Sequence, residues 1–249
     1  WTAARETLAE VDTQAVTGSE IHMLLEINQH DPTADGLELA GRWANQASNP
    51  DVQWEALMTQ AHDALGEDNN EQALTIFEDA LNVAIEPRQQ YWAKLGKAQV
   101  YRTMENGDKA LSILKGVQNS EDSEVLGQYH IQVAQTLLSM DQPKEALASL
   151  EGYSAKDLGP GWDMTVEELR AQINGHLKEF DAAYKILSDV ETRWPEEEQV
   201  LIPSAIVKIR LLQQEGELGA AQAIAQSSLD IVEDPIYRSQ IDDLLTAMQ

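Results

Sequence analysis

Histidine is the residue best suited to metal binding and to proton transfer near neutral pH, and this chain has five of them. They are His22, His30, His62, His130 and His176, and no two lie four residues apart or in an HExxH motif. A metal site would therefore need ligands from distant segments. The chain has no cysteine, which excludes disulfides, thiolate metal sites and cysteine nucleophiles. The sequence predicts no metal ion.

Catalytic motifs are also missing from the sequence. It contains no GxSxG elbow, no P-loop and no GxGxxG run after a strand pattern. Carboxylates are so abundant, at 43 Asp and Glu, that pairs of them carry little information about acid–base chemistry. We therefore expect no catalytic residues and no cofactor, and we interpret the chain as a protein that is not an enzyme.

The charge of the chain is strongly acidic, with 43 acidic and 17 basic residues and a formal net charge of −26. Such a surface repels polyanions, which argues against nucleic acids and anionic lipid headgroups as partners. We interpret the charge mainly as a solvated face, as in the run Glu196–Glu198. A basic protein partner and a high-salt habitat are the alternatives. No stretch of about 18 residues is apolar enough to enter a bilayer.

An alanine recurs along the chain at a nearly constant spacing. Ala73, Ala110, Ala146, Ala183 and Ala221 are separated by 37, 36, 37 and 38 residues. A period between about 20 and 50 residues is typical of stacked-repeat proteins, in which each unit buries its apolar face against its neighbours. The spacing therefore predicts a repeat architecture.

The residues around each alanine recur as well. Four residues later, one helical turn along the same face, come Phe77, Leu114, Leu150, Leu187 and Ala225. Twelve residues before the alanines come Ala61, Ala98, Ala134, Ala171 and, as the exception, Ile209. Small residues at paired positions are what a close crossing of two helices requires. Strand-like alternation is not visible, so the chain is predicted to be all-α.

This pattern resembles the tetratricopeptide repeat (TPR) family over about residues 51 to 235. Besides the paired alanines, the matching residues are Trp54, Phe77, Tyr101, Pro195 and the turn Gly107-Asp108-Lys109-Ala110-Leu111. The resemblance implies a right-handed α-solenoid of stacked antiparallel helix pairs. The family period is 34 residues. We expect the extra residues here to lengthen the second helices or the loops between units.

The chain is expected to have three parts. Residues 1–50 form an N-terminal helical cap or a degenerate repeat, residues 51–235 form five TPR-like helix pairs, and residues 236–249 form a C-terminal capping helix. The expected pairs are 51–65 with 70–84, 88–104 with 107–118, 123–139 with 143–152, 163–176 with 180–193, and 197–215 with 218–231. The Gly- and Pro-rich stretch 152–161 is either a bend between two sub-arrays or a long loop.

The resemblance also implies a binding groove lined by the first helix of each pair. Carried over to this sequence, its polar and aromatic residues are His62, Trp92, Gln99, Arg102, Gln128, Gln135, Gln172, His176 and Arg210. On the same face we place Glu55, Met58, Leu65, Leu95, Ile131, Leu138, Glu168, Ile206 and Gln213. Amides and arginines suit hydrogen bonding to a peptide backbone or a carboxylate, and Trp92 suits an aromatic anchor. The alternative is that these are ordinary polar positions.

The function favoured by these features is a non-enzymatic adaptor that binds a protein or peptide segment. The start at Trp1 rather than Met indicates that a signal peptide, a membrane anchor or other upstream sequence is missing, and the absence of cysteine fits an oxidising compartment as well as a small cytosolic protein. If a signal or anchor was removed, we expect a bacterial cell-envelope or secretion assembly, with a periplasmic location preferred over a cytoplasmic one. One alternative is a structural protein that forms homo-oligomers by end-to-end stacking. The other is an accessory repeat domain of a larger protein.

Overall fold

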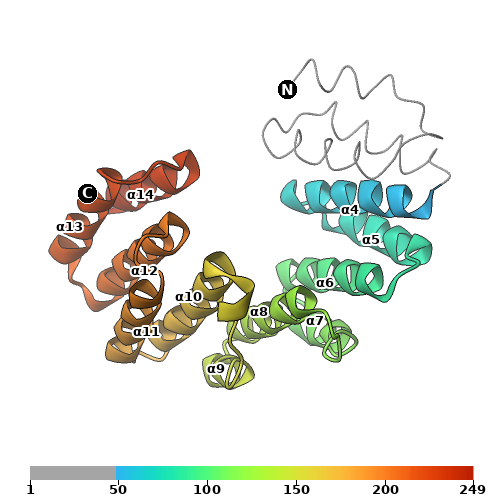
Figure 1. Ribbon diagram of the computed structural model, residues 1–249, viewed down its shortest axis with the longest axis horizontal. Coiled ribbons are helices and arrows are strands. Elements are labelled where there is room, and N and C mark those ends of the chain that lie inside the picture. Colours follow the sequence, from blue (N-terminus) through green and yellow to red (C-terminus); the bar gives the residue numbers. More distant parts are fainter. Residues whose placement is uncertain (1–48, 249) are drawn as a thin grey trace, which may run out of the picture. The chain divides into compact units, whose positions relative to one another are not determined.

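A computed structural model describes residues 49–248, and all regular structure within them is helical (Figure 1). The expected cap over residues 1–50 therefore lies almost entirely outside the described residues. The helices are α4 (Pro50–Gly66), α5 (Asn70–Val83), α6 (Pro87–Thr103), α7 (Gly107–Leu114), α8 (Ser123–Ser139), α9 (Pro143–Ser149), α10 (Pro160–His176), α11 (Phe180–Arg193), α12 (Glu198–Glu215), α13 (Leu218–Leu229) and α14 (Pro235–Ala247), with a 3₁₀ turn η1 (Lys156–Leu158).

Residue contacts divide the chain into two compact units. The first ends at Gln132 and the second begins at Val133, so the boundary falls within α8. We describe each unit by itself. No helix among residues 49–248 combines the length and the apolar character that a membrane crossing demands.

Proline and polar caps set the beginnings of many helices. Proline occupies the first turn of α4, α6, α9, α10 and α14, where its missing N–H removes no helical hydrogen bond. Asn49 accepts a hydrogen bond from the backbone N–H of Asp51, and Asp234 accepts one from Ile236. Glu86 and Gln89 form a reciprocal capping box at the start of α6. The sequence thus fixes these helix starts locally.

The same backbone turn joins the two helices of all five pairs. Five residues before each repeat alanine lies a residue with left-handed backbone angles: Asp68, Glu105, Asp141, Lys178 or Gly216, with φ between 58° and 83°. In each turn the next N–H donates to the carbonyl five residues earlier, for example Asn69 to Ala64 at 2.8 Å and Glu217 to Leu212 at 2.9 Å. This is a Schellman-type helix end, which satisfies carbonyls that the helix leaves free.

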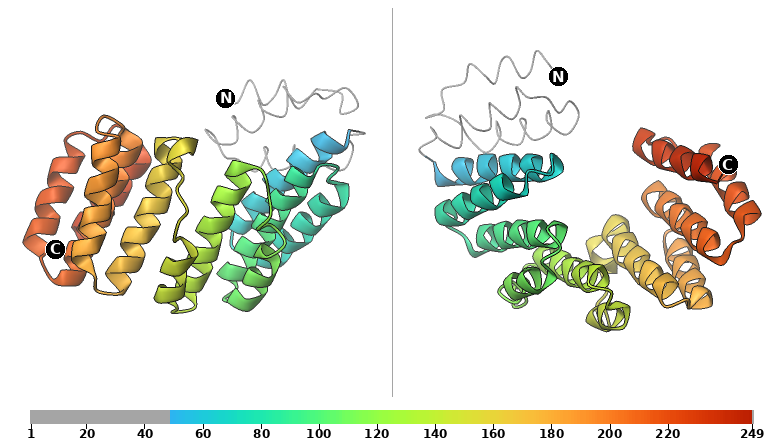
Figure 2. Two further views of the ribbon diagram at one scale, coloured as in Figure 1. Left: turned by 60° about the horizontal axis from the view of Figure 1, so that its bottom comes forward. Right: turned by 180° about the vertical axis from the view of Figure 1, so that it is seen from behind.

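The repeat positions predicted from the sequence are all buried. The five alanines and the residues four positions later are at most 1% exposed, and so are the small residues twelve positions earlier, including Ile209. Within each unit, helices that are neighbours in the stack pack against one another (Figure 2). In the first unit α4 contacts α5 and α6. In the second unit α10 contacts α11 and α12, and α12 contacts α13 and α14. These contacts form continuous apolar cores.

The first unit contains one especially close helix contact. The Phe77 ring of α5 lies against Gly96 of α6, where an added Cβ would stand 2.2 Å from the ring. Both residues are buried. Glycine at this position therefore lets the two helices approach with the aromatic ring between them.

A buried carboxylate connects two helices of the second unit. Asp163 of α10 is fully buried and accepts hydrogen bonds from Arg193 and from the Trp194 indole, the latter at 2.8 Å. Nearby, Glu191 accepts from Ser204 and Lys208, both at 2.6 Å. These contacts join α11 to its neighbours α10 and α12 and supplement the apolar core.

Of the two places expected for the extra residues of each repeat, the second helices and the loops between units, the structure does not favour the second helices. The first helices of the five pairs have 17 or 18 residues, whereas α7 and α9 have only eight and seven. The stretch 152–161 is an ordered loop: the Arg170 guanidinium donates to the carbonyls of Leu150, at 2.8 Å, and of Tyr153. The guanidinium thus holds the beginning of this segment against α10.

Candidate functional site

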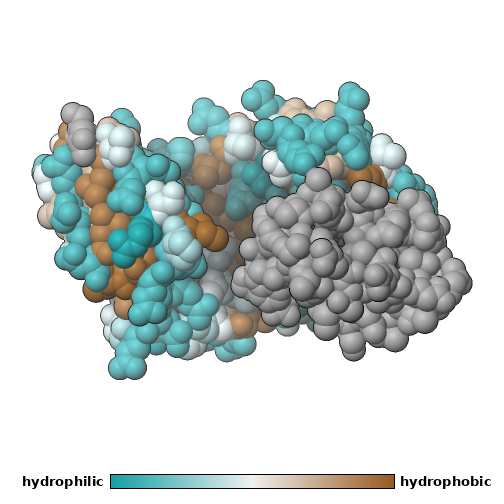
Figure 3. Space-filling view, turned by 90° about the horizontal axis from the view of Figure 1, so that it is seen from above, coloured by the Kyte–Doolittle hydropathy of each residue, from teal (hydrophilic) through white to brown (hydrophobic). Residues whose placement is uncertain are grey.

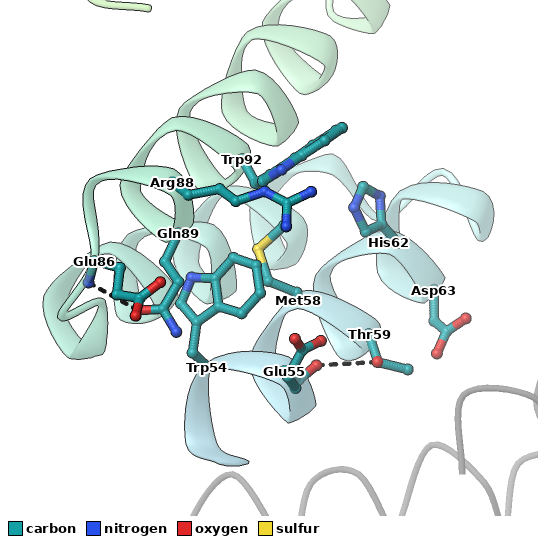
Figure 4. Close-up of a pocket in the computed structure, with 10 residues that line it drawn as sticks. All are labelled: Trp54, Glu55, Met58, Thr59, His62, Asp63, Glu86, Arg88, Gln89 and Trp92. Carbon is teal, nitrogen blue, oxygen red and sulfur yellow. Dashed lines mark hydrogen bonds between the residues drawn. The ribbon is translucent and has the colours of Figure 1, made fainter. Parts of the chain in front are cut away.

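A pocket of about 530 Å³ opens between α4 and α6 in the first unit. Such a volume is within the range of small-ligand and side-chain pockets. Figure 4 shows side chains of the two helices pointing toward one another across it. The lining residues are Trp54, Glu55, Met58, Thr59, His62, Asp63, Glu86, Arg88, Gln89 and Trp92.

The walls of this pocket combine two tryptophans with hydrogen-bonding groups. Trp54 is 8% exposed, and its indole Nε1 is a buried donor for which residues 49–248 supply no acceptor. Trp92 is half-buried and packs against the α4–α5–α6 core. Tryptophan side chains of this kind supply much of the binding energy at protein interfaces.

Local hydrogen bonds hold the rim of the pocket in place. Gln89 donates through Nε2 to Asp51 at 2.9 Å while its Oε1 accepts the backbone N–H groups of Ile85 and Glu86. This side chain therefore links the start of α6 to the start of α4. Thr59 donates to the Glu55 carbonyl at 3.0 Å (Figure 4). The rim is consequently positioned by regular helices and not by a mobile loop.

His62 lies at one side of the pocket and contacts the core. Its ring packs edge-on against Phe77, with 5.2 Å between ring centroids. Part of the ring is exposed, but the surrounding protein lowers the pKa of His62 by desolvation. This shift favours the neutral imidazole.

The structure brings only some of the expected groove residues together. His62 and Trp92 line the pocket, whereas Gln99 and Arg102 lie farther along α6 and outside it. Burial lowers the pKa of Arg102, whose Nε has no hydrogen-bond acceptor among the described residues. Gln128 lies in the first unit and Gln135 in the second, although both are on α8. We therefore assign Gln128 to the surface of the first unit and Gln135 to that of the second.

In the second unit, Gln172 and Arg210 meet around a shared carboxylate. Gln172 donates to Glu168 at 2.8 Å, and the positive charge of Arg210 acts on the same group. Burial nevertheless raises the pKa of Glu168, and Arg210 opposes that shift only in part. Burial raises the pKa of Tyr237 on α14, and the negative charges of Asp234 and Glu168 add to that rise. His176 is exposed at the end of α10.

Three apolar residues assigned to the groove face belong to the core instead. Leu95, Ile131 and Ile206 are at most 3% exposed. The predicted groove face therefore included positions that neighbouring helices bury. The spacing of residues along a helix identifies its faces, but it does not show how much of each face a neighbouring helix covers.

The remaining lining residues were not assigned to a site from the sequence. Arg88 and Gln89 occupy the first turn of α6, ahead of the residues taken as groove positions, and Asp63 and Thr59 lie beside the chosen α4 residues. The sequence Glu86-Pro87-Arg88-Gln89 does carry a signal, because it is a capping box with proline at the helix start. That signal places these side chains at a helix end beside Trp54.

Among the described residues, no three His, Asp or Glu side chains are grouped closely enough to hold a metal ion. The chemistry available at the pocket is hydrogen bonding, aromatic contact and charge.

The paired helices, the common turn and the buried small positions define the fold as that of the TPR proteins, an all-α solenoid of stacked helix pairs. Comparison with solved structures confirms the resemblance drawn from the sequence. No protein-family model and no curated protein matches the sequence.

Three solved structures illustrate the likeness. A Rap protein complexed with competence and sporulation factor has a TM-score of 0.63 at 12% identity, over 98% of this chain and 78% of that one. A thermophilic TPR protein of Thermus thermophilus has a TM-score of 0.54 at 18% identity, over 78% and 99%. A TPR protein of Parabacteroides merdae has a TM-score of 0.50 at 11% identity, over 99% of both chains. At these identities the likeness concerns the fold.

Proposed function

We propose that the protein is a non-enzymatic interaction scaffold that holds a segment of another polypeptide against its first helices. The observation that carries this proposal is the pocket between α4 and α6, which has two tryptophans in its wall and a rim fixed by hydrogen bonds. A pocket of about 530 Å³ accommodates one or two side chains of an extended peptide. The similar Rap protein was crystallised with a bound factor, which supports a binding role for this fold.

The first helices of the second unit add a further polar surface to the proposal. There Gln172 and Arg210 present an amide and a guanidinium around the partly buried Glu168. Such groups hydrogen-bond to peptide amides and carboxylates. Reversal of the charge at Arg210 tests the contribution of this surface separately from that of the pocket.

Selection of binders from a random peptide library with the purified full chain tests the proposal directly. We expect selected peptides to lose about 2 kcal/mol of binding free energy, roughly thirtyfold in Kd, with the Trp92→Ala variant. Tyr91→Ala is the matched control, because Tyr91 is the neighbouring aromatic residue on α6 and lies outside this pocket. Circular dichroism checks that both variants keep their helices.

A library that yields no binder would contradict the proposal. So would unchanged affinity of every selected peptide for both the Trp92→Ala variant and the double variant Arg102→Glu, Arg210→Glu, because the first helices would then not form the binding face.

Self-association is the second candidate function, and exposed apolar side chains near the start of α14 favour it. Ile231 and Ile236 are 63% and 67% exposed, and Figure 3 shows apolar surface among the polar residues of this unit. Exposed apolar patches mark interaction surfaces when they are contiguous. A molar mass that rises with concentration in light scattering, and that falls back in an Ile231→Ser, Ile236→Ser variant, would favour stacking over the scaffold function.

We further propose that the scaffold acts in a bacterial cell-envelope or secretion assembly. The absence of cysteine in 249 residues supports this setting, because stray thiols are a liability in oxidising compartments. Fractionation of the native cell tests it: recovery in the cytoplasmic fraction alone would contradict the envelope setting and leave the scaffold function intact.

A further inference from the structure

The charges around the α4–α6 pocket are mostly negative. Glu55, Asp63 and Glu86 each line it, and Figure 4 shows them on different sides of the two tryptophans. The three carboxylates thus do not form a single cluster. Any ligand that enters therefore meets acidic groups from several directions.

Arg88, the only lysine or arginine that residues 49–248 contribute to the lining of this pocket, already has acidic partners. Its Nε lies 2.9 Å from Asp122, and its Nη2 lies 2.6 Å from Glu124. These two carboxylates compensate the guanidinium charge. Desolvation lowers the pKa of His62, which favours its uncharged form. The lining that residues 49–248 contribute therefore carries more negative than positive charge.

Two polar atoms of the wall have no hydrogen-bond partner among residues 49–248. The Oδ2 atom of Asp63 is buried and has no hydrogen-bond donor among the described residues. Burial, with a further contribution from Glu67, raises the pKa of Asp63, so its negative charge is poorly stabilised where it stands. Trp54 contributes a buried indole N–H without an acceptor from residues 49–248. A cation and a carbonyl oxygen are the groups that would complement these two.

We propose that this pocket binds a basic side chain, arginine or lysine, of the polypeptide that the scaffold holds. This inference rests on the proposed function and names the partner chemistry of its main site. The faces of Trp54 and Trp92 attract a cation through the ring quadrupole, and the surrounding carboxylates supply the opposite charge. A main-chain carbonyl beside the basic residue supplies the acceptor for the Trp54 indole.

The overall charge of the protein favours the same partner. The chain carries a formal net charge of −26, which draws basic segments toward it and repels acidic ones. The pocket adds specificity to this general attraction, because it places aromatic walls and a poorly stabilised carboxylate at one location. Binding should consequently weaken with added salt but keep its preference for basic residues.

NMR spectra of the ¹⁵N-labelled full chain test the inference through the indole N–H signals. The probes are alanine-based peptides with one central arginine, lysine, citrulline or glutamate. We expect the arginine and lysine peptides to shift the Trp54 and Trp92 signals, and the citrulline and glutamate peptides to leave them in place. Citrulline matches arginine in shape and lacks its charge, so it separates charge recognition from packing.

Charge-removing variants give the second readout. Glu55→Gln and Asp63→Asn together should weaken binding of the arginine peptide about tenfold, whereas Glu71→Gln, an exposed carboxylate of α5 outside the pocket, should change it less than twofold. If the double variant is misfolded by circular dichroism, Glu55→Gln alone replaces it. Equal binding of the arginine and citrulline peptides, or an equal loss with Glu71→Gln, would overturn the inference.

The library selection keeps this inference apart from the proposed function. Peptides that depend on Trp92 but show no enrichment in arginine or lysine would refute the basic-side-chain site and leave the scaffold function standing. An absence of peptides that depend on Trp92 would refute the site together with the function.

Discussion

The left-handed residue in each of the five helix turns leads to a quantitative prediction about stability. Four of the five left-handed positions are occupied by residues with a Cβ, namely Asp68, Glu105, Asp141 and Lys178. Left-handed angles cost an L-residue about 1–2 kcal/mol, and less for Asp, whereas glycine adopts them without steric cost. Replacement of each residue with glycine should therefore stabilise the protein.

The size of the effect follows from two opposing terms. Glycine removes about 1–2 kcal/mol of backbone strain but loses about 0.5–1 kcal/mol through the greater entropy of the unfolded chain. The expected net gain is about 1 kcal/mol at Glu105 and at Lys178, and about half of that at Asp68 and at Asp141. Because the four positions lie in separate turns, their effects should add to about 3 kcal/mol.

Urea unfolding followed by helical circular dichroism measures this gain. Alanine at the same four positions is the matched control, since it removes the side chain but keeps the Cβ that causes the strain. The reverse change, Gly216→Ala, should cost about 1 kcal/mol, because Gly216 has φ of 83°. If glycine and alanine variants unfold at the same urea concentration, or if Gly216→Ala is neutral, the strain argument is refuted.

Three further predictions concern single side chains. Gly96→Ala should destabilise the first unit by about 1–3 kcal/mol, because its Cβ would overlap the Phe77 ring; thermal unfolding measures the loss, and Phe77→Leu should make the added methyl less costly. Asp163→Asn should cost about 2 kcal/mol in urea unfolding, since it removes a buried charged acceptor; a neutral result would show that the ion pair adds nothing. His62 should titrate below pH 6.5 by NMR. Since its folded pKa is lowered, stability should fall as pH decreases from about 6.5, and His62→Gln should reduce that fall.

The fold was predictable because small residues must recur where helices cross. Ala73 and its counterparts could be found by spacing alone, and the structure buries every one of them. Helix length was less predictable. The α7 helix ends at Leu114, although Val117 continues the apolar pattern and is buried from the following turn, because a side chain can fill the core from a turn as well as from a helix.

The candidate site was only partly predictable for a related reason. His62 and Trp92 both line the pocket, but the rim depends on Gln89, whose side chain joins the start of its own helix α6 to Asp51 of α4. Contacts between elements distant in sequence are not encoded in the spacing within one helix. Leu95 shows the opposite case, because it has the spacing of a groove residue but is buried in the structure.

The turn that joins each helix pair has a consequence for how this protein can change. Its shape is specified by backbone angles and main-chain hydrogen bonds, and it is made equally by acidic residues, a lysine and a glycine. Mutations at these corners therefore alter the energy of the native state without redirecting the polypeptide. The turns of such a protein can accumulate substitutions until its repeats share little sequence similarity, while the backbone still connects the two helices of each pair in the same way.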